Sequence, residues 1–213
     1  MATATDIPQV QETRTGRRLA WPVFLALAAA LPTLVWAFWG GDLIVDDWYF
    51  AAVARFEGIT DFPFRWRPVA SSYHALTFSL LGAHSLPHLL LLAGLNGLAA
   101  VLVWQVARRL LPTRLAVLTS LAWVSLPNRG SMRLWITNAP NMLSLCLLLW
   151  AALLVCRQYR EEKRAGSVPA VVGLVVLSAL AYEGSIALGL LVVAAAAWRG
   201  GATRRARLAR VAA

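Results

Sequence analysis

Charged residues are scarce in this chain, and their scarcity excludes an ordinary water-soluble domain. Only 14% of the 213 residues are charged, whereas 59% are hydrophobic, and the mean hydropathy is +0.63. A soluble domain of this length carries about a quarter charged residues. So large an apolar fraction cannot be hidden inside one water-facing core, and we therefore expect most of the surface to face lipid.

Cysteine and acidic residues are also few. Cys146 and Cys156 both fall in one apolar run, which predicts neither a disulfide framework nor a metal cluster. Ten acidic residues stand against twenty Lys and Arg, which gives a net charge of +10. In a soluble protein this excess would favour nucleic acid, but Lys and Arg are also expected beside the cytoplasmic ends of membrane helices. We therefore expect a lipid bilayer, and no nucleic acid, as the partner.

Long apolar runs predict an all-α fold, a polytopic bundle of transmembrane helices. About 20 helical residues cross the ~30 Å of hydrocarbon in a bilayer. Such runs occupy residues 19–39, 86–109 and 134–156, with a marginal one at 114–127. The last run, 168–198, is about ten residues longer than one span needs and is interrupted by "YEGS". It therefore predicts two short helices that turn near Glu183.

A segment of residues 40–85, which begins with the polar stretch 40–68, separates the first two spans. It holds half of all the acids in the chain, namely Asp42, Asp46, Asp47, Glu57 and Asp61. Within it, residues 69–82 are apolar but too short to cross a bilayer. This segment predicts an amphipathic helix that lies in the membrane interface.

Arginine clusters predict the orientation of the bundle. They occur before the first span, after the second, after the fourth and after the last: Arg14, Arg17 and Arg18; Arg108, Arg109 and Arg114; residues 157–164; and residues 199–210. If all are cytoplasmic, residues 1–18 form a basic cytoplasmic N-terminus and residues 199–213 a basic cytoplasmic tail. Residues 19–198 then form the transmembrane domain of a multi-pass protein of the plasma (inner) membrane, with 40–85 as its first outer loop. The first span is long for a cleaved signal peptide and predicts an uncleaved anchor.

This topology brings Asp46, Asp47 and Glu183 to one extracytoplasmic end. A carboxylate at that end can act as a general base, and two adjacent carboxylates can hold a divalent metal such as Mg or Mn. The alternative for the pair is simple solvation after a membrane helix. Glu183 lies in an otherwise apolar run, where an ionisable side chain is costly and is by default functional.

Basic and amide side chains near the same end are candidates for substrate binding. Arg65 and Arg67 carry guanidinium groups, the planar partners of phosphate, which could instead contact lipid headgroups. The three histidines His74, His84 and His88 flank the interface without metal-site spacing, and a lone histidine there is more often structural. Asn138 and Asn141 either form hydrogen bonds between helices or line the same cavity.

These elements, in this order, resemble the N-terminal part of the C-type integral-membrane glycosyltransferases, which use polyprenyl-phosphate sugars as donors. The resemblance is carried by a first helix followed by "DDWYF" and "RWRPV", a helix opened by His88 and ended by "RRL", a helix that ends before "RLWIT", and a hairpin containing "LSALAYEGSIAL". The chain departs from the family at Gly94 or Leu95, where a second histidine is common, and at "NRGS", which replaces an acid. It also has Tyr182 where a basic residue often precedes the hairpin glutamate.

The resemblance implies a cell-envelope glycosyltransferase, a hexosyl or pentosyl transferase, in which Asp46 or Asp47 is the catalytic base, sometimes with a divalent metal. We take Arg65, Arg67, His88 and Asn138 as the candidate substrate-binding residues and expect Glu183 to position the base or the acceptor. Because such enzymes usually have more helices, the chain is expected to be about half of one, which acts with a missing C-terminal half or another membrane subunit. The alternatives are a non-catalytic truncated relative or assembly partner and a small transporter, although we find no internal repeat.

Overall fold

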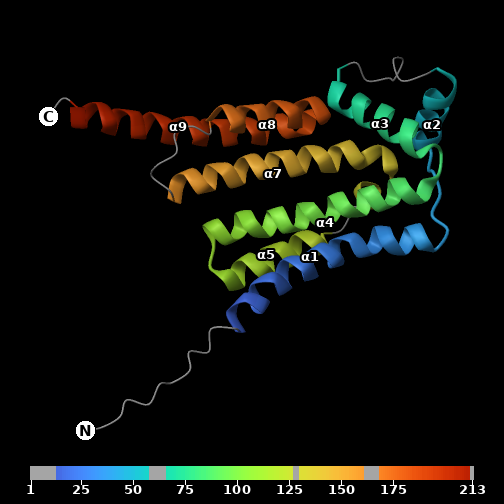
Figure 1. Cartoon of the computed structure of the whole chain (residues 1–213), viewed down its shortest axis with the longest axis horizontal. Coiled ribbons are helices and arrows are strands. Elements are labelled where there is room, and N and C mark those ends of the chain that lie inside the picture. The colour runs from blue at the N-terminus through green and yellow to red at the C-terminus, as the bar shows by residue number, and fades with distance from the viewer. Residues whose placement is uncertain (1–12, 58–65, 127–129, 161–167, 212–213) are drawn as a thin grey trace, which may run out of the picture.

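The computed structural model describes residues 13–57, 66–126, 130–160 and 168–211, with 13–19, 158–160 and 199–211 described by their backbone alone. Within these ranges every regular element is helical, which confirms the predicted fold class. The long helices lie side by side, and short helices cover one end of the bundle (Figure 1).

Three segments are long and apolar enough to cross a membrane, and they confirm three of the predicted spans. They are Ala20–Phe38, Ser85–Leu110 and Ile136–Arg157. They belong to α1 (Thr13–Phe38), to α4 (Ser85–Leu110), and to the 3-10 turn η2 (Ile136–Asn138) followed by α7 (Ala139–Arg160). Helix α4 packs between α1 and α7. At Gly97 of α4 a Cβ atom would stand 3.2 Å from the carbonyl oxygen of Ala26, so the small residue lets α1 and α4 approach closely.

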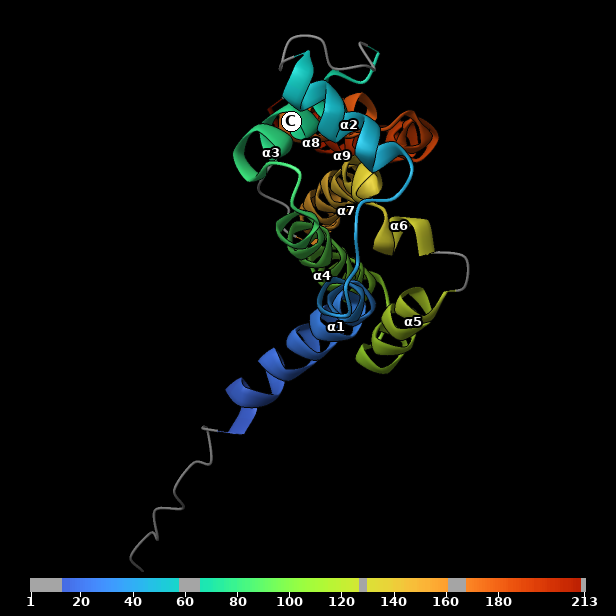
Figure 2. The same cartoon turned by 90° about the vertical axis from the view of Figure 1, so that its right-hand side faces the viewer.

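The marginal span predicted at 114–127 is not a full span. Helix α5 (Thr113–Ser125) has 13 residues, about 20 Å of helix. Pro112 precedes it and Leu126, the residue before Pro127, is extended, as expected for a residue that precedes proline. The short helix α6 (Gly130–Leu134) and η2 then lead to the start of α7 (Figure 2).

The last apolar run is a helical hairpin, as predicted. Helix α8 (Val168–Ala181) is followed by the 3-10 turn η4 (Glu183–Ser185) and by α9 (Ile186–Val211), which returns along α8 and α7. At Gly189 a Cβ atom would stand 2.6 Å from Cγ1 of Val175, so the glycine permits the close contact between the two helices. Helix α9 continues through residues 199–211 of the predicted basic tail.

The loop between α1 and α4 carries two helices that lie across the end of the bundle (Figures 1 and 2). They are α2 (Asp46–Phe56) and α3 (Pro68–Leu81). Helix α3 confirms the helix predicted at 69–82; it begins at a proline and ends at Gly82, whose φ of 66° suits glycine.

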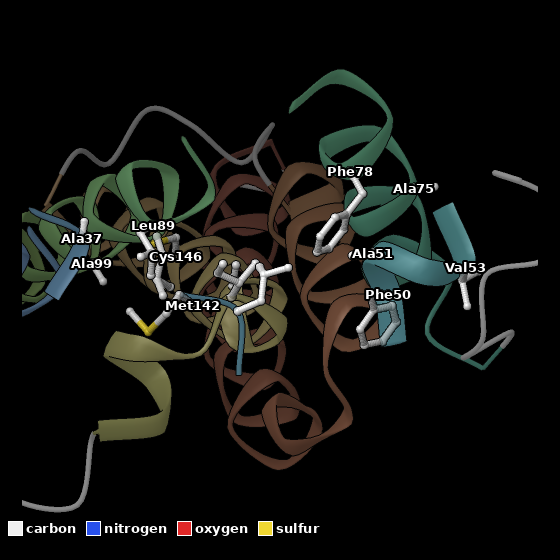
Figure 3. Close-up of a cluster of buried hydrophobic side chains, with 14 of the residues drawn as sticks. Ala37, Phe50, Ala51, Val53, Ala75, Phe78, Leu89, Ala99, Met142 and Cys146 are labelled. Atoms are coloured by element: carbon white, nitrogen blue, oxygen red, sulfur yellow. The ribbon is translucent and has the colours of Figure 1, made fainter. Parts of the chain in front are cut away.

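Helices α2 and α3 together form a cap over this end, and hydrophobic packing fixes the cap to the bundle. Phe50 of α2 and Phe78 of α3 share a buried cluster with Leu89 of α4 and Met142 of α7 (Figure 3). Because all four side chains are at most 3% exposed, the cap is part of the core. The cap therefore holds its polar groups in fixed positions above the bundle.

Candidate active site

The acids predicted to converge do lie at one end of the molecule. Asp46 and Asp47 begin α2, Glu183 begins η4, and both elements lie at the end where α1 finishes and α4 and α7 start (Figure 1). The two acids of the pair have different surroundings, however. Asp47 is fully buried, whereas Asp46 is exposed.

Asp47 ties the first outer loop to η2. Its Oδ2 accepts a hydrogen bond from the backbone N–H of Ile44 (2.9 Å), and its Oδ1 accepts one from the backbone N–H of Thr137 (2.8 Å). The Asp47 N–H in turn donates to the Ile44 carbonyl oxygen (2.8 Å), which closes a turn around Val45. Val45 has φ 41°, a strained value for a β-branched residue. The carboxylate of Asp47 therefore holds a strained turn and a distant backbone segment together.

Removing this carboxylate is expected to destabilise the fold. Asp47→Ala leaves two part-buried backbone N–H groups without their acceptor, and should lower the free energy of unfolding by about 2–4 kcal/mol. Asp47→Asn keeps one acceptor oxygen and should fall between wild type and Asp47→Ala. Thermal unfolding in detergent measures both. Asp42→Ala, at an exposed acid that bonds only the next N–H, is the control; equal melting of Asp47→Ala and wild type would contradict the assignment.

Arg67 and Glu183 form a two-pronged ion pair across the same end. The Nε and Nη2 atoms of Arg67 donate to Oε2 and Oε1 of Glu183, a residue 116 positions later in the chain. The guanidinium carbon lies 4.8 Å from the ring centroid of Tyr182, in cation–π geometry. The hydrogen bonds from Arg67 are the main reason that the pKa of Glu183 is lowered. Arg67 thus places a positive charge beside Glu183. The sequence has Tyr182 at the position before this glutamate, where the family that it resembles often has a basic residue.

A small polar pocket opens beside this ion pair. Its volume is ≈ 30 Å³, and residues of α3, η2, α7 and α8 and the residues that flank them line it: Arg67, Ala70, His74, Thr137, Asn138, Pro140, Asn141, Ala181 and Tyr182. Among the described residues, the lining contains one guanidinium, one imidazole, two amides and a phenol, but no carboxylate. Such a set suits a neutral or anionic polar group.

His74 is the lining residue that sequence reasoning undervalued. Its side chain is 2% exposed, and its ring is stacked on Phe50, with a centroid distance of 4.4 Å and an interplanar angle of 22°. Burial is the main cause that lowers its pKa from 6.5 to about 4; the charge of His88 lowers it further, and the Thr137 backbone partly offsets this. The imidazole is therefore neutral at pH 7.

This pKa shift predicts a pH dependence of stability. Below pH 6.5 the unfolded chain takes up a proton on His74, whereas the folded chain does so only near pH 4. Acid therefore favours the unfolded state, and on the order of 3 kcal/mol of stability should be lost as the pH falls from 6.5 to 4, with none lost above that window. Melting curves of wild type and His74→Phe across this range isolate the effect, because all other titrating groups are shared. Parallel pH profiles would contradict it.

The remaining predicted site residues divide between the pocket and other places. Asn138 lies in the pocket wall and donates to the carbonyl oxygen of Ser131 (3.2 Å), and Asn141 also lines the pocket. His88 lies outside the pocket lining; it is 1% exposed, and its Nε2 lies 2.9 Å from the Gly82 carbonyl oxygen. Its placement does not support a substrate-binding role. Arg65 lies outside the described residues.

The side chains of Asp46 and Asp47 are not arranged as the ligands of a metal ion. Both oxygens of Asp47 already accept backbone N–H groups. In the part of the chain that the structure describes, no group of three or more His, Cys, Asp or Glu residues could hold a metal ion. The arrangement does not fit the divalent metal that the sequence suggested for Asp46 and Asp47.

Comparison with known proteins identifies the family. A family model described as dolichyl-phosphate-mannose-protein mannosyltransferase matches residues 63–210. The match includes Arg67, the pocket and Glu183, and it begins after Asp46 and Asp47. No curated protein and no solved structure matches the chain. Since the match extends over more than half of the sequence, this chain is a multi-pass membrane protein that belongs to the dolichyl-phosphate-mannose-protein mannosyltransferase family, of the C-type glycosyltransferase architecture.

Proposed function

We propose that this protein transfers a sugar from a polyprenyl-phosphate donor to a hydroxyl group of an extracytoplasmic acceptor. The observation that carries the proposal is the position of Arg67, in the wall of a polar pocket at the end of an apolar bundle. A guanidinium fork matches the oxygens of a phosphate group. The lipid tail of the donor stays in the bilayer, and its phosphate reaches Arg67 at the interface. The family to which the chain belongs supports the same donor class.

Asp46 is the better of the two candidates for the general base. Asp47 is buried and has both oxygens engaged, whereas Asp46 is exposed in the first turn of α2. The positive end of the helix dipole favours a carboxylate at this position. Asp47 then acts as a positioning residue, because it holds the turn from which Asp46 projects.

The reaction proceeds by displacement at the anomeric carbon. Asp46 removes the proton of the acceptor hydroxyl as its oxygen attacks, and the bond between the anomeric carbon and the phosphate oxygen breaks. The electron pair of that bond leaves with the lipid phosphate, whose negative charge Arg67 stabilises. The configuration at the anomeric carbon inverts. Glu183 holds Arg67 in place by their paired hydrogen bonds, and Arg65 is a second candidate phosphate ligand.

The distribution of arginine supports an extracytoplasmic active site. Arg108 and Arg109 end α4, and Arg157 lies in the last turn of the α7 span, so all three lie at the end of the bundle opposite the pocket. Basic residues flank the cytoplasmic ends of membrane helices. The N-terminus would then be cytoplasmic.

A transfer assay with the full chain tests the proposal. Liposomes that contain the purified protein, polyprenyl-phosphate mannose and an added membrane extract as the source of acceptor should release polyprenyl phosphate. They should also form a labelled glycosylated product. Protein-free liposomes with the same extract are the control. Equal release with and without the protein would contradict the function.

A further inference from the structure

The pocket beside Arg67 contains a buried imidazole with an unused hydrogen-bonding atom. We infer that this pocket is a subsite for one hydroxyl group of the donor's sugar and that His74 is the side chain that binds this hydroxyl. The inference rests on the proposed function, because it takes Arg67 as the ligand of the donor phosphate.

The first argument is the hydrogen bonding of His74. Its Nδ1 is buried and has no hydrogen-bond partner in the part of the chain that the structure describes. Buried polar groups in native proteins are nearly always hydrogen-bonded, so an exception needs an explanation. The ring cannot simply turn away, because Phe50 stacks on it and Tyr73 meets it edge-on at a centroid distance of 5.6 Å. Because His74 is also a lining residue of the pocket, whereas His88, Trp104 and Arg133, which have unpartnered buried atoms too, are not, we take a bound ligand as the partner of its Nδ1.

The second argument is the geometry of the wall. Ala70 and His74 are four residues apart, which places both on one face of α3, and Arg67 is the N-cap residue of that helix. The amides of Asn138 and Asn141 complete the lining from η2 and α7. The volume of ≈ 30 Å³ has room for about one or two water-sized groups, which is enough for a hydroxyl but not for a sugar ring.

The third argument assigns the hydroxyl to the donor. The sugar of a polyprenyl-phosphate sugar is bonded directly to the phosphate, so a group that shares a small pocket with Arg67 lies within one sugar ring of that phosphate. The acceptor hydroxyl, in contrast, attacks the anomeric carbon from the side opposite the leaving phosphate. Among the described residues that line the pocket there is also no carboxylate, so these residues offer no partner for a cationic amino sugar. A neutral hydroxyl of the donor sugar fits it best.

The test compares two ligands that differ only in the sugar. Polyprenyl-phosphate mannose and sugar-free polyprenyl phosphate are titrated into the purified full chain. His74→Phe keeps the stacking ring but removes the hydrogen bond. It should weaken binding of the mannose-bearing ligand by about three- to tenfold and leave binding of the sugar-free ligand unchanged. His74→Asn places a polar atom near the position of Nδ1 and should restore most of the lost affinity.

Thr77→Val is the matched control. Thr77 is a buried polar residue of the same helix, its Oγ1 donates to the Tyr73 carbonyl oxygen (2.9 Å), and it is not part of the pocket lining. This variant should bind both ligands as wild type does. The subsite is disproved if His74→Phe weakens both ligands equally or neither of them, or if it raises only the KM of the acceptor. A wild-type protein that binds neither ligand would refute the proposed donor as well.

Discussion

Asp46→Asn is expected to lower the turnover number for sugar transfer by about 10²–10⁴-fold, because an amide cannot accept the proton of the attacking hydroxyl. Binding of polyprenyl-phosphate mannose should change little, since Arg67 provides the phosphate contact. Folding should also be preserved, because the side chain of Asp46 is exposed. Single-turnover transfer and donor titration on the same preparation separate the two quantities.

Two acids of the same loop provide the controls for this result. Asp42→Asn changes another exposed carboxylate, four residues before Asp46, and should retain wild-type turnover. Asp47→Asn should lower turnover together with the melting temperature, since Asp47 acts through the turn that it holds. If Asp46→Asn is fully active while Asp47→Asn is inactive at wild-type stability, Asp47 is the base and the assignment above is wrong.

The architecture could largely be predicted from the sequence, because a bilayer imposes a simple length rule. The apolar runs predicted at 19–39, 86–109 and 134–156 correspond to the three candidate spans of the structure. The interruption by "YEGS" corresponds to the η4 turn. The rule failed at residues 114–127, where the apolar composition sufficed but proline at both ends limits the helix to 13 residues.

The contacts of the site could not be predicted in the same way. Asp46 and Asp47 look equivalent in the sequence, and one contact that distinguishes them is a hydrogen bond from Thr137, 90 positions away. The ion pair between Arg67 of the first outer loop and Glu183 of the α8–α9 hairpin is likewise a long-range contact, which no local sequence pattern predicts. One signal was available: the four-residue spacing of Ala70 and His74 places both on the same helical face, in the helix that begins directly after Arg67.

The ion pair that joins Arg67 to Glu183 should matter much more for donor binding than for stability. The side chains are 24% and 53% exposed, and ion pairs with this exposure stabilise proteins by at most about 1 kcal/mol. Arg67→Ala should therefore shift the melting temperature only slightly. It should weaken donor binding by about 10- to 100-fold, because a charge-assisted contact to phosphate is lost. Arg67→Lys keeps the charge without the fork and should lie between Arg67→Ala and wild type.

Glu183→Gln tests whether Glu183 only holds Arg67 in place or contacts the substrate itself. Glutamine still accepts a hydrogen bond from Arg67, but it no longer competes as an anion with the phosphate of the donor. Donor affinity should therefore stay equal to that of wild type or rise, while the melting temperature falls slightly. The double variant Arg67→Glu with Glu183→Arg should recover the stability lost by Arg67→Glu alone, yet it should not recover donor binding, because residue 183 is not part of the pocket lining. If Glu183→Gln instead loses as much donor affinity as Arg67→Ala, Glu183 contacts the substrate directly and does not merely hold Arg67.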